Sequence, residues 1–403
     1  MREALPGFKV FGGIIMNRRQ AGQGDHHQRK TLQSEASGQK ALTGRRSGIS
    51  GAFAAAGPPP GTAAARRIFM AELNFGAEPL VLEHKGNILL NYCFNITLYA
   101  PELTSSQRRE ALLTIFDEYT ALYGPRLNWT TNPATGAWKK LGGGIHNYMT
   151  PHEWLMNHTE GENYSFLYHG GKKRTDASDV SFMVMAEAWY GVERHDLSLV
   201  SCRFPLADVR GDAVDLPELL RRWCALLRPL HARGGYSAGW WYDCYEERPL
   251  IYGTLADELM RYPGLQFDGV TETLFDEKHQ AGLYNGPRCA DWLIALSDPF
   301  LERLGGLNAV TGAMQPCPVL PYEGGAVLQA GDAPGPGSDG KPESLPDYLH
   351  LARVIEPVRA RNLHYIICVP DSGTVAGFRP AQELTDAWCA RFSGGNAAQT
   401  GRI

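Results

Sequence analysis

Hydrophobic and polar residues alternate strictly along residues 88–99, which predicts a strand with one buried face. One side is formed by Leu90, Tyr92, Phe94, Ile96 and Leu98, and the other by Asn91, Cys93, Asn95 and Thr97. Apolar runs bounded by turn residues predict further strands at 180–190, 197–204, 237–245, 289–296, 319–322, 326–330 and 363–369. Of these, 180–190 with 197–204 and 319–322 with 326–330 are close enough to predict two hairpins.

Helix signals lie between these strands. Thr104 is expected to cap a helix that Gly124-Pro125 ends, and Asp215 to cap a second one with Pro217 in its first turn. Shorter helices are predicted from Thr254 to Pro263, after Asp298-Pro299, and from Ser344 to Ile355. The irregular order of strands and helices, together with the hairpins, predicts an α+β fold of largely antiparallel sheets with packed helices.

The composition divides the chain into unlike parts. Residues 1–69 carry a net charge of +8 and contain no Cys, Trp or Tyr, whereas the remainder carries −12. A segment this polar cannot bury enough apolar area to offset its chain entropy, so we expect 1–69 to be a disordered basic leader. It is either an arm for nucleic acid or, as we favour, the product of a misplaced start upstream of Met70.

The body is expected to span 70–392, followed by a disordered tail at 393–403. Within it, two halves with a similar order of elements, about 80–232 and 236–360, suggest paired lobes. No apolar run reaches the roughly 18 residues of a membrane helix, and Val10 to Met16 is too short for a signal peptide. The eight cysteines lack CxxC spacing, which is typical of free thiols in a reducing compartment.

The string Gly235-Tyr236-Ser237-Ala238-Gly239 matches the GxSxG motif of a nucleophile elbow. That elbow needs a strand before the serine and a helix after it, so that the hydroxyl projects from a tight turn. Here a predicted helix precedes the motif and a predicted strand follows it. We interpret the motif as a turn of small residues where a helix returns into the sheet, and keep a hydrolase that uses Ser237 as an alternative.

A dense histidine stretch raises the question of a metal site. It comprises His146, His152, Glu153, His158 and His169. The spacing misses the HExxH pattern that places two imidazoles on one helix face, and Gly, Asn and Pro predict a polar surface loop. A metal site assembled by the fold stays open as an alternative. Leu141-Gly142-Gly143-Gly144 lacks the Lys-Ser/Thr of a P-loop, so we predict no cofactor and no metal.

Residues 236–277 form an acidic stretch with a net charge of −7 and several aromatic residues. Acidic side chains beside aromatic anchors suit a surface that grips a basic protein. The alternative is a solvated acidic face that only keeps the protein soluble. Because phosphate binding needs clustered Lys and Arg, an acidic body disfavours direct binding of nucleic acid.

From Leu89 to Val358 the chain resembles the type VI secretion immunity family, the TsiV-type proteins. The resemblance is carried by short stretches in the same order and spacing, at 168–171, 230–239, 261–265, 300–307, 329–334 and 345–348. Each of them is a structural turn and none is a catalytic signature. Residues 1–69 fall outside the resemblance.

The resemblance implies a cytoplasmic antitoxin that performs no reaction and blocks a cognate effector, a nuclease of the VRR-Nuc type, by covering its active site. It directs attention to the acidic stretch as the effector-binding surface. The candidate residues are Asp243, Glu246, Glu247, Asp268, Glu272, Asp276 and Glu277 as charges and Trp240, Trp241 and Tyr245 as anchors. Since one of two adjacent strand residues faces inward, Trp240 or Trp241 is alternatively a core residue. A structural subunit of the secretion apparatus is the third alternative.

Overall fold

The structure is a computed structural model of the 403-residue chain. It describes residues 9–11, 14–16, 81–133, 135–145, 148–186, 197–240, 247–267, 282–361, 363, 367–370 and 378–393. Within the basic leader, the described residues form two short paired strands, β1 (Lys9–Phe11) and β2 (Ile14–Met16). The predicted disorder of the rest of 1–69 and of 394–403 lies outside the described residues and stays a prediction.

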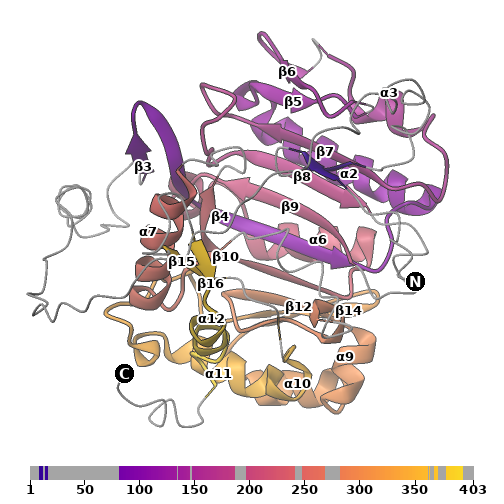
Figure 1. Ribbon diagram of the computed structural model, residues 1–403. Helices are drawn as coiled ribbons and strands as arrows, with labels where there is room; N and C mark the ends of the chain where they lie inside the picture. Colours follow the sequence, from indigo (N-terminus) through magenta and orange to yellow (C-terminus); the bar gives the residue numbers. More distant parts are fainter. Residues whose placement is uncertain are drawn as a thin grey trace, which may run out of the picture. The chain divides into compact units, whose positions relative to one another are not determined.

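Residues Ala77–Ile403 belong to one compact unit, whose described part is built on a 12-stranded sheet (Figure 1). The strands follow the order β13-β14-β12-β10-β4-β9-β8-β7-β5-β6, with β3 paired to β4 and β11 to β10. All pairings in this sheet are antiparallel except that of β10 with β11. The bounds are β3 Val81–His84, β4 Asn87–Ala100, β5 Trp129–Thr131, β6 Trp138–Lys140, β7 Tyr164–His169, β8 Ser181–Ala186, β9 Ser198–Phe204, β10 His231–Trp240, β11 Gln266–Phe267, β12 Leu293–Ser297, β13 Val319–Tyr322 and β14 Gly325–Gln329. The predicted α+β fold with largely antiparallel strands is therefore confirmed.

Helices pack around this sheet, and a second small sheet pairs β15 with β16. The helices are α2 Ser106–Tyr123, α3 Pro151–Leu155, α5 Leu206–Arg210, α6 Leu216–Leu227, α7 Arg248–Arg261, α9 Asp298–Arg303, α10 Leu307–Met314, α11 Pro346–Ile355 and α12 Gln382–Cys389, and the two strands are β15 Cys368–Pro370 and β16 Phe378–Pro380. None of the helices in the described parts of the chain is both long and apolar enough to cross a membrane.

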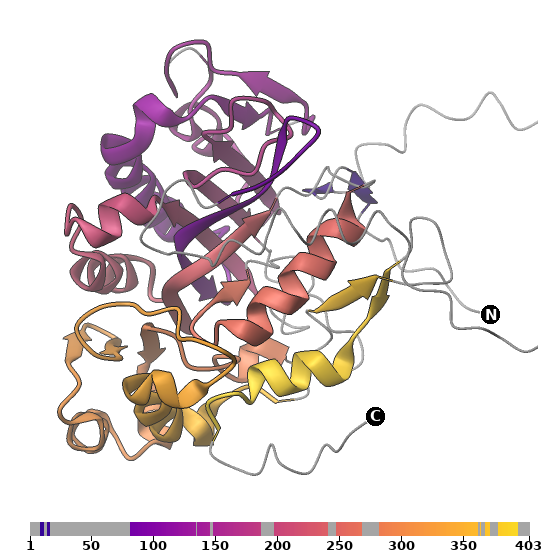
Figure 2. The ribbon, with the colours of Figure 1, turned by 90° about the vertical axis from the view of Figure 1, so that its left-hand side faces the viewer.

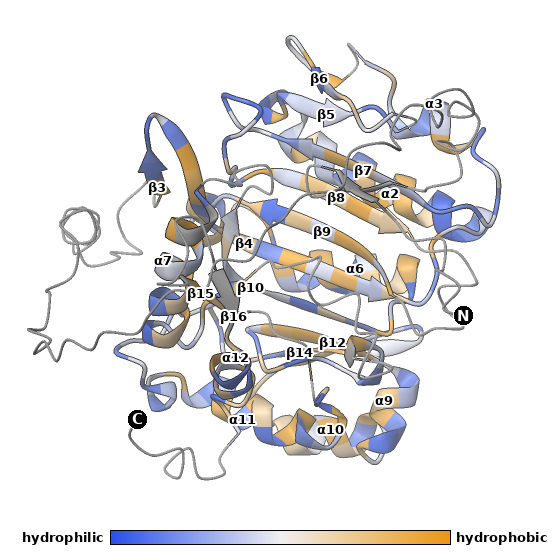
Figure 3. Ribbon diagram, viewed as in Figure 1, coloured by the Kyte–Doolittle hydropathy of each residue, from blue (hydrophilic) through white to orange (hydrophobic). Residues whose placement is uncertain are grey.

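The alternation in β4 separates an aromatic face from a polar one. Both faces are buried, so the prediction of a single buried face was wrong, because other parts of the fold cover the polar side. Phe94 on the aromatic face meets Phe204 of β9 at 6.4 Å, and Phe204 in turn meets Tyr119 of α2 at 5.6 Å and Trp223 of α6 at 6.2 Å between ring centroids. Figure 2 shows α2 and α6 on the same side of the sheet, and Figure 3 shows the apolar residues along these strands and helices. Burial of these rings is the main force that holds the two helices to the sheet.

Several local predictions are confirmed. Asp215 caps α6, since its Oδ1 accepts a hydrogen bond from the Glu218 amide at 3.1 Å. Both predicted hairpins are present, β8 with β9 and β13 with β14. The cap predicted at Thr104 is wrong by one residue, because α2 begins after Ser105 and the Thr104 hydroxyl binds Glu102 instead. The helix predicted to start at Thr254 begins earlier, at Arg248.

The central strand differs most from its prediction. The strand predicted at 237–245 begins at His231, so the GxSxG motif lies inside β10 and not in a turn. This strand pairs with β4 over all ten of its residues, from His231 with Tyr99 to Trp240 with Leu90. The boundary between the two suggested lobes also falls within β10, and one sheet crosses it. Whether the two halves resemble each other stays a prediction.

Candidate functional site

Two strands within the acidic stretch, β10 and β11, end next to each other. Strands β10 and β11 run parallel, with Ser237 beside Gln266 and Ala238 beside Phe267. Their carboxyl ends, Trp240 and Phe267, therefore meet at one place, where the two rings are 6.0 Å apart. Residues 241–246 and 268–281, which carry most of the predicted effector-binding acids, follow directly in the sequence. Because β10 and β11 are parallel, both acidic segments begin at the same edge of the sheet.

Three buried arginines hold the last backbone carbonyls before these segments. Arg203 Nη2 donates to the Trp240 carbonyl at 3.4 Å. Arg288 Nη2 donates to the Phe267 carbonyl at 2.8 Å, and Arg233 Nη2 donates to the same oxygen at 3.5 Å. Hydrogen bonds from charged donors are stronger than neutral ones, and the low polarity of the interior strengthens them further. The arginines therefore fix where each acidic segment leaves the sheet.

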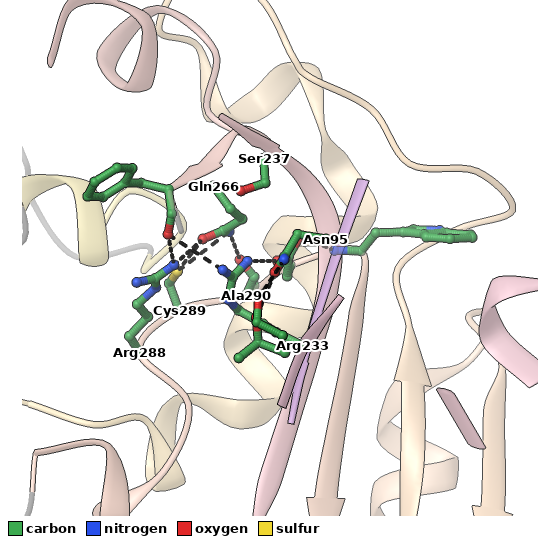
Figure 4. A network of polar contacts seen from close by, with 12 residues as sticks. Asn95, Arg233, Ser237, Gln266, Arg288, Cys289 and Ala290 are labelled. Carbon is green, nitrogen blue, oxygen red and sulfur yellow. Dashed lines mark hydrogen bonds and ion pairs between the residues drawn. The ribbon is translucent and has the colours of Figure 1, made fainter. Parts of the chain in front are cut away.

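Gln266 belongs to this polar network, which Figure 4 shows from close by, and Asp291 joins it through Arg233. Gln266 accepts from Arg288 at 3.3 Å and donates to the Ala290 carbonyl at 3.3 Å. Asp291 forms an ion pair with Arg233 at 3.5 Å and accepts from the Trp292 amide at 2.8 Å. Burial raises the pKa of Asp291 to about 6, with Arg233 opposing the rise. At neutral pH the carboxylate is therefore mostly charged and keeps its pairing with Arg233.

The glycines of the GxSxG string make room for this network. A Cβ at Gly235 would overlap the Asp291 carboxylate, and a Cβ at Gly239 would lie 2.7 Å from the Arg203 guanidinium carbon. Ser237 lies between them, fully buried in the strand and beside the network in Figure 4. The prediction of a turn of small residues was therefore wrong. The motif lies within strand β10, and its glycines leave room for the Asp291 and Arg203 side chains beside that strand. Ser237 also lacks the strand-to-helix turn of a nucleophile elbow.

Only two of the ten predicted effector-binding residues lie within the described part of the chain. Trp240 is 1% exposed and packs against Tyr252 at 5.6 Å, so it is a core residue, as the alternative interpretation had it. Glu247 is half-buried at the N-cap of α7, where a carboxylate interacts favourably with the helix dipole. Outside the described residues lie Trp241, Asp243, Tyr245, Glu246, Asp268, Glu272, Asp276 and Glu277.

Two further acids of the stretch lie on α7 and differ from each other. Asp257 is exposed, whereas Glu258 is 6% exposed and its Oε2 has no hydrogen-bond partner among the described residues. Burial raises the pKa of Glu258 to about 7, Arg261 opposes the rise, and Asp257 adds to it. Glu258 thus contributes less negative charge at neutral pH than the sequence count assigns to it.

The described residues of the histidine stretch do not converge on one point. His152 is exposed and its Nε2 lies 2.8 Å from Asp117 Oδ1, while His158 packs between Trp154 and Tyr164. His169 is buried on β7, where burial lowers its pKa to about 3 and its Nδ1 accepts from the Gly171 amide. Glu153 belongs to the capping box of α3. His146 lies outside the described residues, and within them no group of three or more potential ligands could hold a metal ion.

The arginine network is not predictable from a motif in the sequence. Arg203, Arg233 and Arg288 stand singly in apolar or small-residue surroundings, and no spacing links them. A charged residue inside a predicted strand that is otherwise apolar, as Arg203 is in 197–204, was the one available signal. Such a residue needs a buried partner, which in all three cases is a backbone carbonyl more than 20 residues away in the sequence.

The sequence matches a known protein family over most of its length. A family model described as type VI immunity for VRR-NUC, named TsiV, matches residues 111–392. The chain therefore belongs to this family, and the resemblance seen in the sequence is confirmed. No curated protein gives a match.

A solved structure gives the same fold independently. The Pseudomonas aeruginosa T6SS protein PA0821 superposes with a TM-score of 0.63 and covers 83% of this chain and 91% of its own. Its sequence identity of 22% is low, so the likeness supports the fold and not a shared partner.

Proposed function

We propose that this member of the type VI immunity family protects its cell by binding a VRR-Nuc effector and covering the substrate groove of that nuclease. The observation that carries the proposal is the parallel pairing of β10 and β11, from which two acid-bearing segments start side by side. A nuclease must hold phosphate groups with basic side chains. Two segments that carry six acidic residues in sequence and begin next to each other suit that basic groove.

Charge also favours fast association. The chain without its leader carries a net charge of −12, and 236–277 carries −7 of it. Opposite charges steer two proteins together and raise association rates to about 10⁸ M⁻¹s⁻¹ or more at low salt. We place this encounter in the cytoplasm, where the DNA that such a nuclease attacks is found.

The protection itself is tested by co-expression with the effector encoded beside this gene. We expect cells that express both proteins to grow and cells that express the effector alone to stop growing. Equal growth arrest in both cultures would refute the immunity role.

The acidic surface is tested by neutralising Asp268, Glu272, Asp276 and Glu277 together to Asn or Gln. Each lost charge pair at an interface weakens binding, so we expect calorimetry to show affinity at least tenfold lower. The matched control neutralises four exposed acids elsewhere, Glu302, Asp339, Glu343 and Glu383. An equal loss in both variants would show that only the net charge acts, and no loss in the first would place the interface elsewhere.

A further inference from the structure

Two arginines contact one buried tryptophan of α12. The guanidinium carbons of Arg288 and Arg391 lie 4.9 Å and 4.5 Å from the centre of the Trp388 ring. A second link joins the two arginines, because Arg391 Nη1 donates to Cys289 Sγ at 3.4 Å and Cys289 follows Arg288 in the chain. The three side chains are therefore neighbours, and we call Arg288, Trp388 and Arg391 the Arg–Trp–Arg cluster.

Each member of the cluster carries an N–H group that has no acceptor among the described residues. These groups are Arg288 Nε, Trp388 Nε1 and Arg391 Nη2, and all three atoms are shielded from solvent. Arg288 is only 3% exposed and Trp388 is fully buried. Nearly all buried polar groups in proteins are hydrogen bonded, and an exception can mark the place of a bound ion or water. Three such groups on neighbouring side chains indicate a ligand that accepts hydrogen bonds.

The charge of the cluster requires this ligand to be negative. Within the described part of the chain, neither Arg288 nor Arg391 forms an ion pair, and the buried carboxylate of Asp291 is paired with Arg233 instead. Burial lowers the pKa of Arg288, and the positive charge of Arg233 lowers it further. Arginine nevertheless stays protonated in proteins. Because an uncompensated buried charge is costly, an anion beside these guanidinium groups is strongly favoured.

The donors also restrict the shape of the anion. A guanidinium group presents its N–H groups in a flat fork that matches the oxygen atoms of a carboxylate or a phosphate. We infer that the Arg–Trp–Arg cluster binds a small oxyanion of the phosphate or carboxylate type. Arg391 is partly exposed, which gives a solute access to the cluster from solvent. This site goes beyond the proposed function and does not depend on it.

A bound oxyanion also acts on the chain next to β11. Arg288 Nη2 donates to the Phe267 carbonyl at 2.8 Å, and Arg391 Nε donates to the Pro263 carbonyl at 2.5 Å. Pro263 and Phe267 enclose the short connection from α7 into β11. An anion that holds both arginines therefore stabilises the connection that leads to the acidic segment 268–281.

The experiment measures the midpoint of thermal unfolding of the full chain at neutral pH. Inorganic phosphate and acetate are added separately, each compared with chloride at the same ionic strength. A ligand that binds only the folded protein raises the midpoint, so we expect one of the two oxyanions to raise it by about 2–4 °C and to saturate near 10 mM. The oxyanion that acts identifies the ligand as phosphate-like or as a carboxylate.

Two variants connect the shift to the cluster. Trp388→Phe keeps an aromatic ring for both arginines and removes only the indole N–H group, whereas Arg391→Gln removes one positive charge. We expect each variant to lose most of the shift. Arg303→Gln is the matched control, because Arg303 also contacts an aromatic ring, Phe300 at 5.4 Å, and donates to the Pro357 carbonyl at 3.4 Å. It is expected to keep the full shift, and since each variant is compared with itself in chloride, a general loss of stability does not affect the result.

Two results would overturn the inference. The first is a wild-type protein whose midpoint neither phosphate nor acetate raises, which would show that the cluster holds the fold without an anion. The second is an equal shift in the wild type, in Trp388→Phe and in Arg391→Gln, which would show that the salts act on the protein surface in general. Neither result changes the outcome of co-expression with the effector, so the proposed function is tested separately.

Discussion

Both faces of strands β4 and β10 are buried, one among aromatic side chains and the other among polar and charged side chains. On one face, aromatic rings from the sheet meet those of α2 and α6, and Phe204 alone contacts four other rings. On the other, Asn95, Arg203, Arg233 and Asp291 are buried and each needs partners at fixed positions. The aromatic face favours folding by burying apolar surface, whereas the polar face fixes the position of backbone segments.

The largest effect is expected on the aromatic face. Phe204 contacts Phe94, Tyr119, Tyr123 and Trp223, so Phe204→Ala leaves a cavity among four rings. We expect a loss of about 3–5 kcal/mol in the free energy of unfolding, measured by urea denaturation. A loss below about 1 kcal/mol would show that α2 and α6 repack freely, and that this face is less tightly packed than its contacts indicate.

A smaller effect is expected on the polar face. Gly235→Ala places a methyl group where the Asp291 carboxylate lies, so either the strand or the Arg233–Asp291 ion pair must shift. We expect a loss of about 2–3 kcal/mol. Gly312→Ala on α10 is the matched control, because its Cβ meets nothing within 4 Å and alanine favours helix by about 0.5–1 kcal/mol. Equal effects of the two substitutions would contradict the crossing of Asp291 over β10.

The smallest expected effect is a pH dependence of stability that separates the two buried carboxylates, Glu258 and Asp291. Unlike Asp291, Glu258 has no ion-pair partner among the described residues, and its pKa rises from 4.5 to about 7. The folded protein binds the proton of Glu258 more tightly than the unfolded chain does. Protonated Glu258 therefore stabilises the fold at low pH, and this stabilisation is lost as the pH rises from about 4.5 through about 7. We expect Glu258→Gln to raise the free energy of unfolding by about 2 kcal/mol at pH 8 and to change it little at pH 5. An equal change at both pH values would exclude this titration.

The sequence predicted those parts of the fold whose signal is local. The strand at 88–99, the cap at Asp215 and the two hairpins each depend on neighbouring residues, and all are present. That both faces of this strand are buried is not a local property and was not predicted. The start of β10 was not predictable in this way. His231 to Gly235 contains an arginine and two glycines, a poor strand composition, and becomes a strand because β4 and β12 pair with it from both sides.

The candidate site was predicted only in outline. The count of acidic residues in 236–277 identified the stretch, but not that Trp240 and Glu258 are buried. Burial of a single side chain depends on elements distant in sequence, such as Tyr252 and Phe267 for Trp240. The arginines that hold the ends of β10 and β11 likewise act through tertiary hydrogen bonds, which no pattern in one sequence reports.

The large sequence separation between β4 and β10 affects how the sheet forms while the chain is being synthesised. Their paired residues are more than 130 positions apart, yet β10 lies in the middle of the sheet. A ribosome that adds about 5–20 residues per second needs roughly 7–30 seconds to pass from one strand to the other. During that delay β4 has an open edge, and closing so distant a pair is slow. A newly initiated molecule therefore completes its central sheet only after this delay.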